Sequence, residues 1–231
     1  ENGPLSLKSI TGGEFYAHGI YGVNPLADGE SYSQLVDGKR IVVSSFKTGE
    51  QTGVLFDADN TKGKVKVSRI DGYIMSPNQK NILLRTQTQS IYRHSTTAVY
   101  YIYNVQNRTL APLSDGGPQE CPLWSPDGNM VGFVREGNLF LVKLLFDNAE
   151  VQITKDGKFN SIINGKADWV YEEEFVTNRS FDFNADATML AWIRYDESQV
   201  PLFSFPMYKG THPEMKENAE YPGAYEYKYP I

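Results

Sequence analysis

The sequence predicts an all-β protein, a partial β-propeller of several four-stranded antiparallel blades with one short helix that carries Glu172, Glu173 and Glu174. Three observations predict this fold. The composition favours strands and turns, one turn motif recurs along the chain, and one acidic and aromatic run is unlike the rest. At about 40–50 residues per blade, the 231 residues supply roughly five blades at most, and nothing in the pattern indicates that the ring closes within this chain. We therefore expect the propeller to be open because the chain is truncated.

The composition is that of a globular protein rich in strands. Fifteen Tyr, 12 Phe, 20 Gly and 12 Pro favour strands and tight turns over helices. The formal net charge of −6 comes without a basic stripe, which argues against nucleic acid as a partner. No apolar run reaches the roughly 18 residues of a membrane span. The one cysteine, Cys121, permits no internal disulfide and no cysteine-based metal site.

The domain organisation follows from where the recurring pattern starts. Residues 1–30 are expected to be an N-terminal segment leading into the first blade, and residues 31–231 to be the incomplete propeller domain. The chain begins without an initiator Met or a signal-like segment, which indicates a processed or engineered boundary. It ends within a strand-like stretch, so we expect it to be a piece of a longer protein.

A turn with an Asp or Asn, often preceded by Pro and followed by Gly, lies between apolar runs four times. Its acid or amide falls at Asp37, Asn78, Asp127 and Asp186, which are 41, 49 and 59 residues apart. Pro followed by Asp and Gly suits a tight chain reversal. Several short strands per unit of about 40–50 residues are typical of propeller blades. A β-sandwich with coincidental turns is the alternative.

Further strands are predicted between and after these turns. The candidates are residues 53–56, 65–67, 98–103 and 138–144, where β-branched, aromatic or alternating apolar residues gather. From Tyr195 onward the repeat is lost and the chain becomes aromatic and rich in Pro. Within this tail, residues 221–231 alternate Tyr with charged residues, as an edge strand does.

Residues 168–175 read Asp-Trp-Val-Tyr-Glu-Glu-Glu-Phe. On a strand, Glu173 and Glu174 would point to opposite faces, whereas on a helical turn they can converge on one small cation. Asp168 can cap such a turn by accepting hydrogen bonds from its free N–H groups. The sequence therefore predicts a short helix after Asp168.

Glu173 and Glu174 are predicted to bind a primary ammonium group. An ammonium offers three donors, and charge-assisted hydrogen bonds to carboxylates are strong. The alternative is an exposed acidic helix turn with no ligand. A divalent metal is the weaker hypothesis, because no His lies at ligand spacing and no calcium-loop order occurs. We expect no metal and no cofactor.

Arg93, in the run Arg-His-Ser at residues 93–95, lies between two predicted strands. Its guanidinium could donate to substrate carbonyls and balance the glutamates, or it could be an ordinary surface residue. His18, His94 and His212 have no metal spacing and are expected to be structural. No Gly-x-Ser-x-Gly elbow and no phosphate-binding Gly-rich loop occurs, so no catalytic residue is assigned within this chain.

Residues 164–174, Asn-Gly-Lys-Ala-Asp-Trp-Val-Tyr-Glu-Glu-Glu, resemble the signature of the dipeptidyl peptidase IV family of serine peptidases, in the prolyl oligopeptidase superfamily. Residues 93–95, the turns at 76–77 and 124–126, and the segments 200–202 and 228–230 resemble further stretches of that family. The likeness runs from about residue 31 to the end of the chain.

The resemblance implies an eight-bladed propeller and a separate C-terminal α/β-hydrolase catalytic domain that is absent from this chain. In such a family Glu173 and Glu174 bind the free N-terminus of the peptide, Arg93 contacts a backbone carbonyl of the bound dipeptide and the neighbouring glutamate, and Glu172 is structural. The implied activity is release of N-terminal X-Pro or X-Ala dipeptides, with this chain anchoring the α-amino group and gating access while being inactive alone.

Other expectations follow from the same resemblance. The partners would be a peptide with a free N-terminus, the catalytic domain of the same protein and a second copy in a homodimer. The compartment would be periplasmic or extracellular. The alternative function is a non-catalytic propeller module from an inactive homologue, and a tripeptidyl peptidase relative would be expected to alter the paired glutamates.

Overall fold

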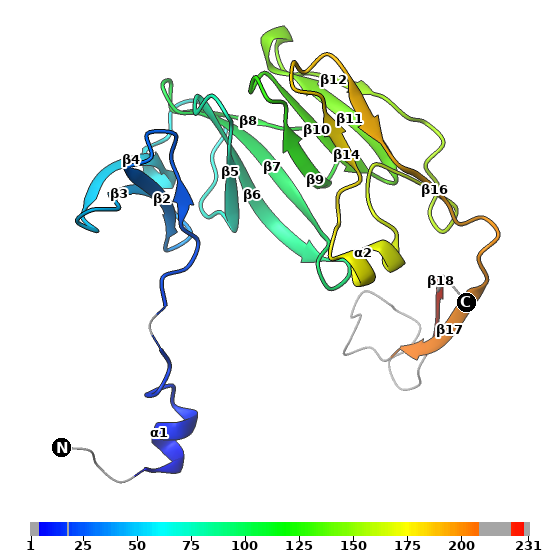
Figure 1. Ribbon diagram of the computed structural model, residues 1–231, viewed down its shortest axis with the longest axis horizontal. Coiled ribbons are helices and arrows are strands. Elements are labelled where there is room, and N and C mark those ends of the chain that lie inside the picture. The colour runs from blue at the N-terminus through cyan, green and yellow to red at the C-terminus, as the bar shows by residue number, and fades with distance from the viewer. Residues whose placement is uncertain (1–4, 18, 208–222, 229–231) are drawn as a thin grey trace. The chain divides into compact units, whose positions relative to one another are not determined.

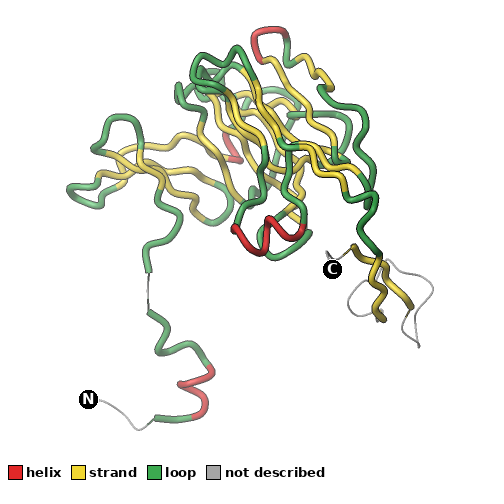
Figure 2. The backbone as a smooth tube through the Cα atoms, turned by 45° about the vertical axis from the view of Figure 1, so that its right-hand side comes forward, coloured by secondary structure: helices red, strands yellow, loops and turns green. Residues whose placement is uncertain are grey.

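The computed structural model describes residues 5–17, 19–207 and 223–228, and the chain divides into two compact units, Glu1–Asp57 and Ala58–Ile231. Antiparallel strands are the main regular secondary structure of both units (Figure 1). Helical segments make up a small part of the described chain beside the strands (Figure 2). They are α1 (Leu7–Thr11), α2 (Trp169–Phe175) and the 3-10 turns η1 (Ala58–Asn60) and η2 (Leu144–Phe146).

The first unit contains α1 and one four-stranded antiparallel sheet in the order β1-β2-β3-β4. Its strands are β1 (Asn24–Pro25), β2 (Ser31–Val36), β3 (Arg40–Ser45) and β4 (Gln51–Asp57). The strand predicted at residues 53–56 lies within β4. Because β1 pairs with β2, this sheet begins inside the segment 1–30. Ile41 and Phe56, a register pair of β3 and β4, are almost fully buried.

The repeated turn has the same backbone hydrogen bonds at each occurrence. In the third copy the N–H of Ser125 donates to Met130 O at 2.9 Å and that of Gly128 donates to Ser125 O at 2.9 Å. The turns that begin at Ser76 and Asn184 repeat this pattern, and so does one that begins at Leu26. Each of these turns spans four residues, and the third residue of the turn is Asp28, Asn78, Asp127 or Asp186.

The choice of Asp37 as the first copy is consequently wrong, because Asp28 occupies the equivalent position. The spacing from Asp28 to Asn78 is 50 residues, close to the 49 from Asn78 to Asp127. Asp37 and Gly38 instead are the central residues of the turn between β2 and β3, which Lys39 N closes by donating to Val36 O at 3.0 Å, and their φ angles are 53° and 66°. Positive φ at both positions is the type I′ geometry of tight hairpins. The dipeptide Asp-Gly suits this hairpin turn as well as it suits the repeated turn, so the sequence alone did not distinguish them.

The second unit contains two further four-stranded antiparallel groups, joined into one eight-stranded sheet where the start of β9 pairs with β7. The first group is β5 (Gly72–Met75), β6 (Asn81–Ser90), β7 (Thr96–Asn104) and β8 (Thr109–Pro112). The second is β9 (Gln119–Trp124), β10 (Met130–Arg135), β11 (Asn138–Lys143) and β12 (Ala149–Gln152). The strands predicted at 98–103 and 138–144 correspond to β7 and β11.

These two groups pack together through a shared hydrophobic core. Leu83 and Ile102 from the first group lie in one buried cluster with Trp124, Val131 and Phe133 from the second. Two hydrogen bonds add specificity. The indole Nε1 of Trp124 donates to Ile74 O at 3.1 Å, and the Asn78 amide donates to Asp127 O at 2.9 Å, which links two equivalent turns.

Three short pairs of strands follow. They are β13 (Ile162–Asn164) with β16 (Arg194–Asp196), β14 (Phe181–Phe183) with β15 (Leu190–Trp192), and β17 (Leu202–Met207) with β18 (Gly223–Lys228). Phe181 packs against Val134 and Leu139 and so joins β14 to the preceding group. Of the predicted strand at 221–231, residues 223–228 form β18, and the rest lie outside the described residues.

The predicted strand at residues 65–67 is wrong. This segment is irregular, although Val67 is buried. Lys66 turns back and donates to Thr61 O and Thr61 Oγ1. Residues 65–67 pair with none of the described strands, so the chain buries Val67 without forming a ladder.

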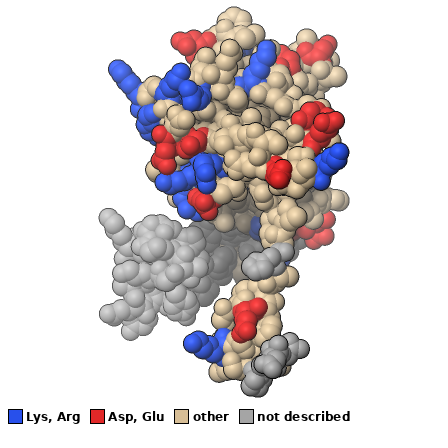
Figure 3. All heavy atoms as spheres, turned by 90° about the vertical axis from the view of Figure 1, so that its left-hand side faces the viewer, with Lys and Arg blue, Asp and Glu red and all other residues tan. Residues whose placement is uncertain are grey.

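The four-stranded sheet of the first unit and the two four-stranded groups of the second carry equivalent turns, which confirms the all-β partial propeller in preference to the sandwich alternative. On the face drawn in Figure 3, acidic and basic side chains are interspersed. Within the described part of the chain, no helix has both the length and the apolar character needed to cross a membrane.

Candidate substrate-binding site

The helix predicted after Asp168 is present as α2. Asp168 has an extended backbone (φ −72°, ψ 175°), and its Oδ1 accepts a hydrogen bond from Tyr171 N at 2.8 Å. This is the N-cap interaction that satisfies one of the free N–H groups of a first helical turn. The predicted helix and its cap are confirmed.

α2 ends at Phe175, and the next residue, Val176, adopts a left-handed conformation with φ 54° and donates its N–H to Glu172 O at 3.1 Å. Aromatic packing attaches α2 to β16. The Tyr171 ring meets the ring of Tyr195, on β16, edge to face at a centroid distance of 5.1 Å. The Tyr195 hydroxyl in turn hydrogen-bonds with Ser180 Oγ at 2.9 Å. α2 is therefore held at its start, its middle and its end.

Glu172 points inward and is 1% exposed. Its Oε1 accepts hydrogen bonds from the backbone N–H groups of His94 and Ser95, each at 2.7 Å. These residues belong to the loop that joins β6 to β7, and Figure 1 shows that hairpin end beside α2. The first of the three glutamates thus binds α2 to the β6–β7 hairpin.

Arg93 lies in the same loop and faces α2. Its Nε is 3.0 Å from Glu173 Oε2 and 3.3 Å from Glu173 Oε1. The side chain of Arg93 is 72% exposed, whereas that of Glu173 is 20% exposed. The structure therefore brings together two of the three residues that the sequence predicts for substrate binding.

Glu174 is the third predicted residue, and it is exposed. No hydrogen bond or ion pair from another described residue is recorded at its carboxylate. It follows Glu173 directly on α2, so one neutralised carboxylate and one uncompensated carboxylate are adjacent on the helix. Such a pair can accept several hydrogen bonds from a single cationic donor.

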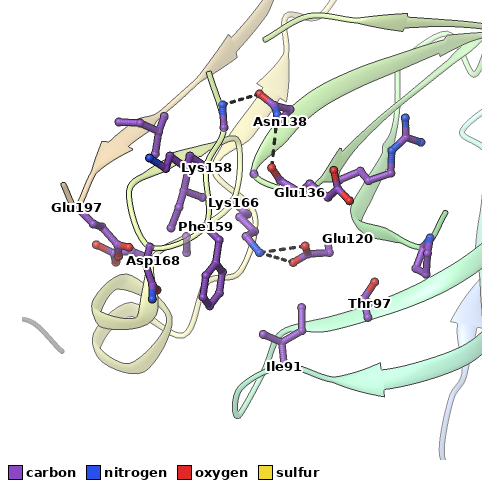
Figure 4. A pocket seen from close by; sticks show the side chains of 18 of the residues that line it. Ile91, Thr97, Glu120, Glu136, Asn138, Lys158, Phe159, Lys166, Asp168 and Glu197 are labelled. Carbon is purple, nitrogen blue, oxygen red and sulfur yellow. Dashed lines mark hydrogen bonds and ion pairs between the residues drawn. The ribbon is translucent and has the colours of Figure 1, made fainter. Parts of the chain in front are cut away.

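A pocket of about 700 Å³ borders the N-terminal end of α2. Figure 4 shows Ile91 and Thr97, from the β6–β7 hairpin, across the pocket from Phe159 and Lys166. Asp168 also contributes to the wall. Arg93, Glu173 and Glu174 are not among the described residues that line this pocket. The two glutamates therefore lie outside the pocket that borders the start of their helix.

An ion pair inside the pocket wall was not anticipated from the sequence. Lys166 Nζ lies 2.7 Å and 3.0 Å from the two oxygens of Glu120, and both side chains are mostly buried, 22% and 11% exposed. Lys166 lies two residues before the helix cap Asp168, so its place in the sequence could have indicated a role near the site. Glu120 lies in β9, and no motif in the sequence around it indicates such a role.

Cys121 lies beside this ion pair, with its thiol within 3.0 Å of Asn178 O. Burial, reinforced by the negative charge of Glu120, raises the pKa of the Cys121 thiol to about 12. The thiol therefore stays protonated at neutral pH, which is the state of an inert structural cysteine.

No group of three or more His, Cys, Asp or Glu side chains in the described ranges is arranged to hold a metal ion. His94 is exposed and its backbone N–H, not its ring, makes the recorded contact with Glu172. His18 and His212 lie outside the described residues.

Known proteins resemble this chain along its length. A family model described as the dipeptidyl peptidase IV (DPP IV) N-terminal region matches residues 76–231. A probable dipeptidyl-aminopeptidase B of Podospora anserina is 32% identical and is matched over 100% of this chain and 24% of its own length. A probable dipeptidyl peptidase 4 of Aspergillus fumigatus is 37% identical over 68% of this chain and 20% of its own length.

Among solved structures, the crystal structure of Porphyromonas gingivalis dipeptidyl peptidase 4 superposes with a TM-score of 0.87 and 40% sequence identity. The superposition covers 99% of this chain and 32% of that protein. The chain thus spans less than a third of the curated relatives' length, as the 24% and 20% coverage values show.

Proposed function

This chain belongs to the dipeptidyl peptidase IV N-terminal region family, and on that premise we propose that it anchors the free N-terminus of peptides for a serine-type dipeptidyl peptidase. The peptidase would release X-Pro or X-Ala dipeptides. The names of the relatives support the peptidase class. The nucleophile would come from an α/β-hydrolase domain outside these residues, because the sequence holds no Gly-x-Ser-x-Gly elbow.

The observation that carries this proposal is the contact between Arg93 and Glu173 beside the unpaired Glu174. The Arg93 contact uses Nε, and a guanidinium has further N–H donors that could serve a peptide carbonyl. The two carboxylates supply the negative charge for the α-ammonium. A dipeptide unit carries both groups at its first residue, an ammonium and a carbonyl, so this arrangement matches it.

Charge selects the ligand in this arrangement. A primary ammonium has three donors and no acceptor, whereas an N-acylated terminus has a single neutral N–H. The neutral group would leave the carboxylate of Glu174 without a cation. The site would therefore favour peptides with a free N-terminus over blocked ones.

A fixed anchor also accounts for the dipeptide as the product. When the ammonium is held at one point, the bonds of the peptide lie at set distances from it. A nucleophile in a second domain then reaches one bond only, and positioning of this kind lowers the barrier for the reacting bond. This chain would measure the length, and the other domain would cleave.

The test is the double variant E173Q/E174Q in the full-length protein. Glutamine keeps the size and the hydrogen-bonding atoms but removes both charges. Because a hydrogen bond to a charged group contributes about 1.5–3 kcal/mol, kcat/KM for a free-amine X-Pro substrate should fall by at least about a hundredfold. The matched control is Glu150→Gln, which removes a carboxylate that pairs with Arg135 at 2.7 Å on a different part of the unit. Wild-type kinetics in the double variant would refute the anchoring role.

Partners and compartment are part of the same proposal. The partners are a peptide with a free N-terminus, the catalytic domain of the same protein and a second copy of that protein. The compartment is the periplasm or the extracellular space. Cell fractionation and the molar mass of the purified full-length protein in solution test these statements, and a purely cytoplasmic monomer would contradict them.

A further inference from the structure

We propose that Glu172 is a positioning residue that sets the distance between Arg93 and the helix carrying Glu173 and Glu174. This inference rests on the proposed function, since it concerns the same site. Glu172 is the one glutamate of the three that faces the interior, where its side chain is 1% exposed. It touches no ligand in this role and acts through the backbone of the β6–β7 loop.

The first step of the argument is the planarity of the peptide group. The N–H of His94 and the Cα of Arg93 belong to the same planar unit. Glu172 Oε1 holds that N–H at 2.7 Å and the next one, of Ser95, also at 2.7 Å. Two bonds to successive N–H groups fix both the place and the tilt of this backbone. The Cα of Arg93 is fixed with it.

The second step concerns the loop itself. Ile91 N donates to Ser95 O at 2.9 Å and Tyr92 N donates to Ser95 Oγ at 3.2 Å. These bonds close the loop on itself but do not connect it to α2. The exposed Arg93 side chain also contacts α2, and the Asn178 amide makes a long contact of 3.4 Å with His94 O. Of these three contacts, that of Glu172 is the one made by a buried carboxylate through two hydrogen bonds of 2.7 Å.

The third step is the position of Glu172 in sequence. It is the immediate neighbour of Glu173 on a rigid helix, while its carboxylate holds the immediate neighbour of Arg93. Both members of the Arg93–Glu173 pair are therefore tied to one buried group. A buried carboxylate is costly unless it is well hydrogen-bonded, and these two bonds provide that compensation. An aliphatic side chain would fill the space without holding the loop.

Three variants of the full-length protein separate positioning from packing. Glu172→Leu keeps volume but removes the acceptor, and Glu172→Asp keeps the charge but withdraws it by one methylene. Glu172→Gln retains Oε1 as an acceptor. We expect KM for a free-amine X-Pro substrate to rise about tenfold in E172L with little change in kcat, the pattern of lost ground-state binding. E172D should show a smaller rise and E172Q the smallest. If E172L does not fold, the order of E172D and E172Q decides the matter.

A double-mutant cycle tests whether the effect passes through Arg93. In a protein that already carries Arg93→Ala, E172L should raise KM by less than about twofold, because coupled residues are non-additive. A merely structural role would add the same factor in both backgrounds. The control is Thr154→Val, which removes another buried side-chain acceptor of a backbone N–H, that of Leu139 at 2.9 Å. It should act additively with Arg93→Ala.

Hydrogen exchange gives a readout that does not depend on activity. The His94 and Ser95 amides should exchange at least about tenfold faster in E172L than in the wild type, because they lose their acceptor. Unchanged exchange, or an unchanged KM in E172L when E173Q/E174Q is impaired, overturns the positioning role alone. Wild-type kinetics in E173Q/E174Q overturn the proposed function instead.

Discussion

The guanidinium Nε of Arg93 lies 3.0 Å from Glu173 Oε2, although 80 residues separate them in the sequence. Arg93 comes from the loop between β6 and β7, and Glu173 comes from α2, which lies between β13 and β14. The pair therefore forms only when these parts of the second unit are folded against each other.

Arg93→Ala should change binding far more than stability. The Arg93 side chain is 72% exposed, and exposed ion pairs contribute about 0–1 kcal/mol to folding. Urea titration should therefore show a loss of less than about 1 kcal/mol, while KM for free-amine substrates rises. A large loss of stability with an unaltered KM would show that the pair serves the fold.

Asp168→Ala should destabilise the protein by about 1 kcal/mol, the usual cost of removing an N-cap side chain. The reason is that Tyr171 N, now 2.8 Å from Asp168 Oδ1, would lose its acceptor. Asp168→Ser can keep this bond and is the matched control. Equal unfolding midpoints for the Ala and Ser variants in a denaturant titration would contradict the capping role.

Val176→Gly should stabilise the protein, because a β-branched residue is strained at φ 54°. The left-handed conformation costs an L-residue about 1–2 kcal/mol, and the larger backbone entropy of Gly takes back roughly 0.5–1 kcal/mol. The net gain should be of order 0.5–1 kcal/mol. Little packing is lost, since Val176 is 68% exposed. Val176→Ala keeps most of the strain and should gain less in thermal unfolding.

Cys121 should react with thiol reagents at pH 8 more slowly in the folded protein than in the unfolded protein, because desolvation of the thiol raises its pKa from 9.0 to about 12. The sign of the pH effect follows from this direction. The folded state holds the thiol proton more tightly than the unfolded state. The contribution of Cys121 to the free energy of unfolding is therefore fully present below about pH 9 and is lost as the pH rises from 9 to 12.

The control for this pH effect is Cys121→Ala, which removes the titrating group. The variant should lose less stability than the wild type between pH 9 and 12. Unfolding curves measured across that interval provide the comparison. Parallel curves for the two proteins would contradict a raised pKa of the Cys121 thiol in the folded state, as would labelling of the native protein at pH 8 as fast as that of the unfolded protein.

Local chemistry decided the features that the sequence predicted well. The helix start at Asp168 depends on a side chain and an N–H only three residues apart, and the turns at 76–81 and 125–130 depend on Pro, Asn, Asp and Gly within a few residues. These interactions form within one short segment. For that reason, composition and spacing sufficed to predict an all-β propeller with one capped acidic helix.

Tertiary structure decided what depended on distant partners. Asp28 and Asp37 both precede Gly, and only strand pairing shows that Asp28 is the counterpart of Asn78 and Asp127. The predicted strand at residues 65–67 is absent, because a strand needs a partner and these residues pair with none of the described strands. Of the three adjacent glutamates, the sequence could not tell which one would be buried, because that depends on where the β6–β7 loop meets α2. Burial and long-range contact are properties of the packed chain, so they are settled only when the sheets come together.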